Sequence, residues 1–237
     1  MRITFRFRWI PFFAAAATIL VGIALGQWQM GRAAEKQAIE NRLSARESAP
    51  ELRLDAAAAD VDALEYRQIR AHGEFVRDWV VYLENRPYQG VPGFYVLMPF
   101  KLTGSDRHVL VERGWVARDL ADRTRLPAIA TPKGAIEITG RVRRNPGKLL
   151  QLGQAQAPRP GAIVQNLDLA EFAQAAGLSL HPFVIEQSSD AQDGLVRDWP
   201  RPSSGVDKHY GYAFQWYALA ATAFIFFVVT GIRRGTN

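Results

Sequence analysis

The 237-residue chain contains no cysteine. This absence excludes disulfide bonds, thiolate metal sites and a cysteine nucleophile. Methionine is also scarce, with three residues, so the soft sulfur ligands that copper(I) prefers are almost missing and a copper carrier is disfavoured. The lack of cysteine does not indicate a compartment, because a domain of this size folds without disulfides on either side of a membrane.

Signatures of catalysis are missing as well. The sequence has no Gly-x-Ser-x-Gly elbow, P-loop, His-Glu-x-x-His motif or dinucleotide fingerprint. Its four histidines, His72, His108, His181 and His209, stand in separate segments, and His181 precedes Pro182 in a predicted turn. We therefore predict that the protein is not an enzyme. A hydrolase stays open only because triad residues need not be close in sequence.

Acidic residues are missing from both ends of the chain, although the net charge is +6. Five of the 29 basic residues stand at the ends, so 24 remain against 23 acidic residues elsewhere. These five are Arg2, Arg6, Arg8, Arg233 and Arg234. A nucleic-acid-binding domain needs a clustered basic patch on its own surface. We therefore predict no nucleic-acid partner and assign the basicity to the flanks of apolar segments.

Charge is absent from two long stretches, Ile10 to Gly26 and Tyr210 to Ile232. Each approaches or exceeds the length with which a helix crosses a hydrocarbon core of about 30 Å. For the first stretch a cleaved signal peptide is the alternative, because Ala24-Leu25-Gly26 resembles a cleavage site. We prefer a retained anchor, since Trp9 and Trp28 bracket the segment as interface residues do.

A stripe of small residues also favours the retained anchor. Ala14, Thr18, Gly22 and Gly26 recur every four residues, and small residues on one face let a second membrane helix approach closely. The basic residues outside both apolar segments then place both termini in the cytoplasm. We predict a multi-pass protein of the bacterial inner membrane with a periplasmic domain between the helices.

The polar middle of the chain alternates apolar and polar residues as β-strands do. The predicted strands are Glu65 to Phe75, Trp79 to Asn85, Phe94 to Leu102, His108 to Val116, Ala135 to Arg143, Ile163 to Leu167 and Phe183 to Gln187. One short helix starts at the N-cap Asp168 and stops at Gly177.

The predicted fold class is therefore an α+β membrane protein. Two transmembrane helices flank a mainly antiparallel β extracytoplasmic domain, a sandwich or partly open barrel with one short helix. The predicted divisions are a cytoplasmic N-terminus (1–8), a first membrane helix (9–28), a helical extension and linker (29–62), a β-rich domain (63–208), a second membrane helix (209–232) and a cytoplasmic C-terminus (233–237).

His209 stands one residue before the second apolar segment. On a helix it shares a face with Ala213, Trp216 and Ala220, while Tyr212 lies on a neighbouring face. The alanines would leave room beside the histidine and Trp216 would offer a flat apolar wall, which suits a haem with a neutral imidazole as axial ligand. The alternative is an ordinary histidine in an aromatic interfacial belt, and the residues alone favour it.

Two loop-rich segments of the middle region are candidate partner surfaces. One contains Arg86 and the other contains Arg113 and Gly114. A glycine inside an apolar strand suggests a bulge or the close approach of another backbone. Turn chemistry and packing explain these segments equally well, so the residues leave both interpretations open.

The sequence resembles the surfeit locus protein 1 family of cytochrome c oxidase assembly factors over nearly its whole length. The matching pieces are Leu25-Gly-Gln-Trp-Gln-x-x-Arg32, Asn85-Arg-Pro with Gly93-Phe, Val109-Leu-Val-Glu-Arg-Gly-Trp115, Gly140-x-x-Arg143 with Asn145-Pro, and His209-x-x-Tyr-Ala-x-Gln-Trp216 ending in Arg233-Arg234. Tyr210 and Tyr217 depart from the family pattern, as does Ala117.

The resemblance implies a membrane assembly factor that binds haem a and assists its insertion into the catalytic subunit of a haem–copper oxidase. It implies that His209 is the axial ligand of the haem iron, with Trp216 and Tyr212 beside the haem. Implied partners are the oxidase catalytic subunit, the haem a synthesis machinery and the lipid bilayer. Two questions stay open: whether the cargo is haem a or haem b, and whether the protein is instead a cofactor-free scaffold for an oxidase subunit.

Overall fold

The computed structural model describes residues 3–5, 7–54, 60–122, 125–150, 156–200 and 205–234. The chain forms two compact units, one of residues 1–43 with 201–237 and one of residues 44–200. Some expectations lie outside the described residues: the basic residues Arg2 and Arg6, and parts of the predicted linker, of the loop after residue 150 and of the segment before the second membrane helix.

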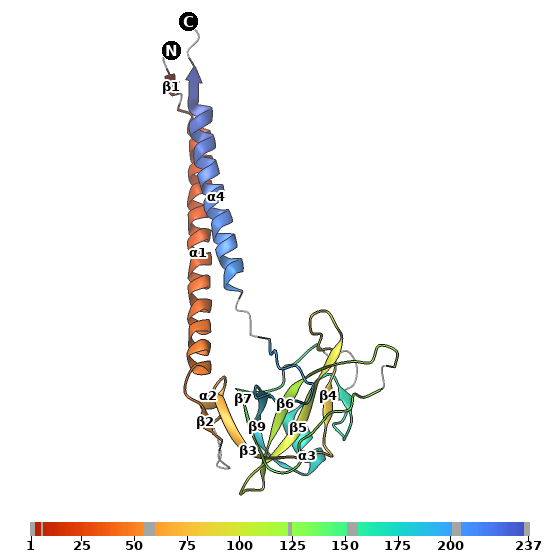
Figure 1. The fold of residues 1–237 in the computed structure, drawn as a ribbon. Coiled ribbons are helices and arrows are strands. Elements are labelled where there is room, and N and C mark those ends of the chain that lie inside the picture. The colour runs from red at the N-terminus through yellow and green to blue at the C-terminus, as the bar shows by residue number, and fades with distance from the viewer. Residues whose placement is uncertain are drawn as a thin grey trace. The chain divides into compact units, whose positions relative to one another are not determined.

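The first unit is built on two long helices, α1 (Trp9–Glu47) and α4 (Val206–Gly231). Both contain a stretch long and apolar enough to cross a membrane, and most of each stretch is exposed rather than buried against protein. α1 continues as a polar helix to Glu47, and its last residues, from Ser44, belong to the second unit. The two helices lie side by side along the first unit (Figure 1).

The ends of the chain meet beyond this helix pair. β1 (Ile3–Phe5) pairs antiparallel with β10 (Ile232–Arg234), with Ile3 opposite Arg234. Both ends of the described chain therefore lie at the same end of the first unit (Figure 1). The helices α1 and α4 therefore run in opposite directions.

In its described residues, the second unit contains eight strands and two short helices. They are β2 (Leu52–Arg53), α2 (Val61–Leu64), β3 (Gln68–Phe75), β4 (Val81–Leu83), β5 (Gly93–Leu102), β6 (Arg107–Ala117), β7 (Ile136–Arg143), β8 (Ile163–Val164), α3 (Leu169–Ala176) and β9 (Ser179–Gln187). The strand order is β2-β3-β7-β9-β6-β5-β4-β8, and β3 also pairs with β5. That extra pairing closes β3, β7, β9, β6 and β5 into a five-stranded barrel.

Alternation along the barrel strands separates two hydrophobic layers. Inward residues of all five strands form one buried cluster that fills the barrel. The opposite face of β5, β6 and β9 packs with β4 and β8 under α3, with Phe172 of α3 fully buried there. α3 is capped as predicted: the Asp168 carboxylate accepts from the backbone N–H groups of Ala170 and Glu171, and Gly177 is left-handed at φ 64°.

The predicted fold class is confirmed, and the strand pairing in the domain is mainly antiparallel as predicted. Three strand pairings are parallel, β2 with β3, β4 with β8 and β6 with β9. β2 was not predicted, because two residues carry no periodicity. β9 begins at Ser179, so His181 lies inside a strand and not in a turn. α4 begins at Val206; the predicted membrane boundaries stay predictions.

Candidate functional site

α1 and α4 pack through small residues. On α4, Ala213 and Ala220 are 2% and 6% exposed, and on α1 both Gly22 and Gly26 are buried. A Cβ on Gly22 would lie 2.9 Å from the Trp216 carbonyl oxygen and 3.0 Å from the Ala220 Cβ. A Cβ on Gly26 would lie 2.5 Å from the Tyr217 ring. A side chain at Gly22 would therefore meet the backbone of α4, and one at Gly26 would displace the Tyr217 ring, so both glycines favour the close approach of the helices.

The buried positions at the start of α4 recur with a spacing of seven residues, and those of α1, Gly22, Gly26 and Ala33, follow one another by four and seven. Val206, Ala213 and Ala220 are buried on α4, and the half-buried residues His209 and Trp216 fall between them. Alternating steps of three and four residues keep one face toward a partner helix. The structure thus places His209 and Trp216 on the face that meets α1, in agreement with the predicted face.

Two expectations about this face were wrong. Ala14 and Thr18 are exposed, and the Thr18 hydroxyl donates to the Ala14 carbonyl oxygen of its own helix. Steps of four residues rotate by about 40° each around a helix, so that stripe leaves the seam within a few turns. The expected room beside His209 is also absent at Ala213, because that alanine is buried, at 2% exposure.

His209 makes a specific contact across the helix pair. Its Nδ1 lies 2.7 Å from Oε1 of Gln29 on α1. Because the partner atom here is the carboxamide oxygen, which accepts, this contact is the one made by the tautomer that carries its proton on Nδ1. In the neutral ring the lone pair then belongs to Nε2, for which no other described residue is a hydrogen-bond partner. A histidine held in this way presents the nitrogen that coordinates a metal.

The residues predicted beside His209 lie on different faces. Trp216 is half-buried and shares the seam with the histidine two turns away, whereas Tyr212 is 53% exposed on another face of α4. Among the described residues no group of three or more His, Cys, Asp or Glu side chains gathers as a metal site. One imidazole with an available lone pair is a donor set that fits a haem iron held by a single protein ligand.

The second unit brings three of the motif segments together. Trp115 Nε1 donates to the Arg86 carbonyl oxygen at 2.6 Å, and the Arg86 guanidinium donates to the carbonyl oxygens of Glu84 and Gly147. A Cβ on Gly93 would overlap the Trp115 ring. The Asn85-Arg-Pro, Gly93-Phe and Gly-Trp115 pieces therefore interlock, which explains the need for glycine and tryptophan at these positions.

Arg113 is fully buried on β6. Its guanidinium pairs with Asp193 at 2.7 Å, and it also donates to the Thr131 hydroxyl and the Ala130 carbonyl oxygen. Asp193 is itself 1% exposed and accepts a second ion pair from Arg197. This network attaches two long loops to the barrel, and a buried arginine of this kind is stable only because each charge has a partner.

Gly114 meets both expectations for a glycine inside a strand. The pairing of β5 with β6 shifts register next to it, and its φ is 150°. A Cβ there would lie 2.8 Å from Leu195 and 2.9 Å from the Val196 carbonyl oxygen. The contacts of Arg86, Arg113 and Gly114 are thus internal to the domain, and partner binding through this region stays a prediction.

A second charged cluster is buried on the other face of the same sheet. Arg141 pairs with Glu186 at 2.5 Å and with Glu47 at 2.6 Å. Glu112 of β6 stands opposite Glu186 of β9, and its Oε1 has no hydrogen-bond partner in the described part of the chain. Burial, followed by the neighbouring Glu186 charge, raises the pKa of Glu112 to about 8, although Arg143 opposes the shift.

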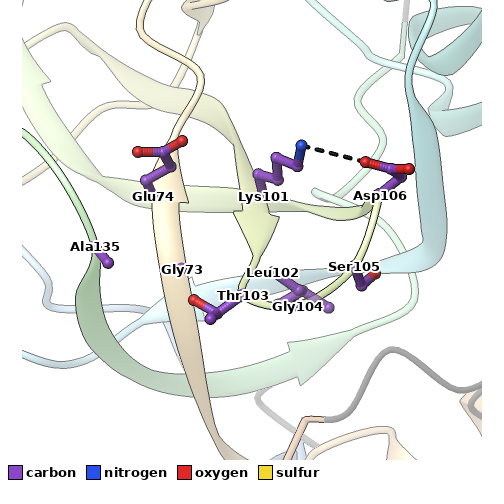
Figure 2. Close-up of a pocket in the computed structure, with 9 residues that line it drawn as sticks. All are labelled: Gly73, Glu74, Lys101, Leu102, Thr103, Gly104, Ser105, Asp106 and Ala135. Atoms are coloured by element: carbon purple, nitrogen blue, oxygen red, sulfur yellow. Dashed lines mark ion pairs between the residues drawn. The ribbon is translucent and has the colours of Figure 1, made fainter.

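A surface hollow lies at the turn between β5 and β6. Figure 2 shows Glu74, Lys101 and Asp106 around it, with Lys101 paired to Asp106 at 3.3 Å. The Lys101–Asp106 pair is solvent-exposed and therefore contributes little to the stability of the fold. The hollow is lined by no histidine, so it adds nothing to the chemistry at His209.

Sequence reasoning missed Gln29, Glu112, Glu186 and Asp193 as partners of the predicted residues. Gln29 and Glu112 belong to matching pieces already noted, the Gln-Trp-Gln and Glu-Arg-Gly-Trp segments. Glu186 and Asp193 carried no sequence signal, because their roles depend on contacts with distant strands.

Comparison with known proteins agrees with the resemblance. The family model described as SURF1 family matches residues 16–221. A SURF1-like protein of Rickettsia bellii (strain RML369-C) is 27% identical over 221 residues, which cover 89% of this chain and 86% of that protein. A SURF1-like protein of Drosophila melanogaster is 26% identical over 223 residues, which cover 86% of this chain and 72% of that protein. With its two membrane-spanning candidates and a match over most of its length, this membrane protein belongs to the SURF1 family, whose members are generally cytochrome c oxidase assembly factors.

Proposed function

We propose that the protein binds haem a at the extracytoplasmic end of its helix pair and assists its insertion into the catalytic subunit of a haem–copper oxidase. The observation that carries the proposal is the His209–Gln29 contact, because it leaves Nε2 of a half-buried imidazole available to iron. The family supplies the oxidase context. The haem a synthesis machinery is the expected donor.

The membrane arrangement supports this role. Basic residues outside both apolar segments favour cytoplasmic termini in a bacterial inner membrane. The β1–β10 pairing supports a common side for both ends. His209, three residues after the start of α4, then lies at the periplasmic end of the membrane segment. A ligand there is within reach of haem that partitions at the interface.

A carrier must release what it binds. A single histidine ligand on a half-buried site gives an affinity that a receiving subunit with its own ligands can exceed, whereas two strong axial ligands would retain the haem. We expect the second axial position to be filled by water, by another residue or by a second protomer. Trp216 would contribute apolar contact on the same helix face.

The test is an absorption spectrum of the purified protein, expressed with and without the haem a synthesis enzymes. Wild-type protein is expected to co-purify with haem a only when those enzymes are present, and His209→Ala is expected to lose the bound haem. His72→Ala is the matched control, because His72 is exposed in the β domain and bonds to Thr103. Indistinguishable haem spectra for wild-type and His209→Ala would remove the ligand role.

A cofactor-free scaffold is the second candidate function. It is favoured by the observation that three of the five matching pieces lie in the β domain, where they interlock. A truncated protein without the two helices would then restore oxidase assembly in a strain that lacks the full-length chain. Under the haem-carrier proposal, the truncated protein is expected to fail.

A further inference from the structure

We infer that Gln29 is a positioning residue that fixes the tautomer and orientation of His209. The ligand part of this inference rests on the proposed function, whereas the tautomer part stands without it. The two residues are 180 positions apart in sequence and belong to different helices of the first unit. Their contact therefore exists only when the helix pair is assembled.

The helix seam determines where Gln29 lies. On α1, Gly26 lies four residues after Gly22, Gln29 lies three residues after Gly26, and Ala33 lies four residues after Gln29. Gly22, Gly26 and Ala33 are buried, so Gln29 continues the same seam. The close approach at the two glycines sets the separation of the helices at this level. A glutamine side chain then spans the remaining gap to His209 Nδ1 at 2.7 Å.

The orientation of the Gln29 carboxamide, with its oxygen toward the ring, fits one tautomer of His209. Gln29 Oε1 accepts the Nδ1 proton, so the lone pair of the neutral ring is on Nε2. Without that acceptor, neutral histidine in water prefers the opposite tautomer, with the proton on Nε2 and no lone pair there. The hydrogen bond also restricts rotation of the ring, as outer partners of metal-ligating histidines do.

Glutamine differs from the usual charged partner in a way that suits a carrier. A carboxylate partner increases the basicity of the imidazole and strengthens the bond to a metal. A neutral carboxamide orients the ring with a weaker electronic effect. The pair therefore prepares the ligand while keeping the affinity compatible with release.

The first experiment is nitrogen NMR of histidine-labelled, haem-free, full-length protein in detergent, with the His209 signals assigned by comparison with His209→Ala. The wild-type signal is expected to show Nδ1 protonated and Nε2 bare. In Gln29→Leu it is expected to shift toward the Nε2-protonated form. Gln27→Leu is the matched control on an exposed position of the same helix, and it should keep the wild-type tautomer.

The second experiment titrates the same proteins with haemin. Gln29→Leu is expected to weaken binding about 10- to 100-fold, and Gln27→Leu to leave it unchanged. Gln29→Glu keeps an acceptor and is expected to retain binding while lowering the reduction potential of the bound iron. If Gln29→Leu weakened haemin binding only because the helices α1 and α4 had separated, Gln29→Glu would not be expected to lower the reduction potential of the bound iron.

The outcomes separate this inference from the proposed function. An unchanged His209 tautomer in Gln29→Leu overturns the inference whatever happens with haem. A tautomer shift without haemin binding by any of the proteins, wild-type included, refutes the proposed function and leaves the hydrogen-bond role of Gln29 intact. If the His209 tautomer shifts in Gln29→Leu, but the haemin affinity of Gln29→Leu and the reduction potential of Gln29→Glu equal those of wild-type protein, Gln29 does not position His209 for iron binding.

Discussion

Replacing Glu112 by glutamine is expected to change how the stability of the protein depends on pH. Glu112 lies on β6 at 2% exposure, with Oε1 lacking a hydrogen-bond partner among the described residues. Burial first, and the Glu186 charge second, raise its pKa to about 8 from an ordinary value of 4.5. Glutamine has nearly the same shape and carries no charge at any pH.

The sign follows from which state binds the proton more tightly. The folded protein holds the Glu112 proton up to about pH 8, while the unfolded chain releases it near pH 4.5. The contribution is therefore fully present below pH 4.5 and is lost as the pH rises toward 8, by up to about 1.4 kcal/mol per pH unit. At pH 7 the loss relative to pH 4.5 amounts to about 3 kcal/mol.

The assay is urea unfolding of the full-length protein in detergent, followed by tryptophan fluorescence at pH 5, 6 and 7. Glu112→Gln is expected to gain stability over wild-type by about 1 kcal/mol for each unit of rising pH. Any constant cost of burying the amide cancels in this comparison. Glu74→Gln, on an exposed position of β3, is the control and should follow wild-type.

One result refutes the reasoning. If the free energies of unfolding of wild-type and Glu112→Gln differ by the same amount at pH 5 and pH 7, Glu112 is ionised in the folded protein. The cluster of Arg86, Arg141 and Arg143 would then outweigh burial and the Glu186 charge.

Two further predictions concern packing. Arg113→Ala is expected to destabilise the protein by about 3–5 kcal/mol in urea unfolding, because it removes a charge partner of the buried Asp193. Arg70→Ala, which removes two exposed ion pairs, with Glu51 and Glu137, should cost less than about 1 kcal/mol for each pair. Gly22→Leu is expected to separate α1 from α4 and make Trp216 more accessible to a brominated-detergent quencher, whereas Gly31→Leu, with open space around its Cβ, should not.

Strands and helix ends could be predicted where they depend on residues that are close together in the sequence. The alternation in β7 reflects burial of its inward residues in the barrel core, whereas β5 is buried on both faces. The Asp168 and Gly177 caps of α3 depend on residues within one turn. The close approach at Gly114 was also predictable. A glycine inside a strand lowers stability, so its presence indicates a position where another part of the chain leaves no room for a side chain.

Closure of the barrel could not be predicted from local sequence patterns. It depends on Gly73 of β3, where a side chain would overlap the Lys101 carbonyl oxygen of β5. A glycine in a strand pattern predicts the close approach of another segment, but it does not identify that segment. The parallel pairing of β6 with β9 is equally non-local, since both strands carry the same apolar alternation that an antiparallel pair would.

The site shows the same division. Helical spacing placed His209, Ala213 and Trp216 on one face, because spacing along one helix is a property of one segment. What that face meets is a property of two segments. The alanines are buried instead of leaving room, and the hydrogen-bond partner of His209 is Gln29 on the other helix.

The matching pieces therefore differ in what they say about function. Those in the β domain contain Arg86, Arg113 and Trp115, whose contacts are internal. Buried polar groups are costly to change because their partners lose compensation, so these pieces identify the fold. A substitution there would abolish oxidase assembly through instability under either proposed function. The pieces that contain Gln29 and His209 meet at one hydrogen bond, where an isosteric change alters the chemistry of a ring and leaves the barrel intact. Among these residues of the matching pieces, that pair is the place where a substitution distinguishes a haem carrier from a scaffold without unfolding the domain.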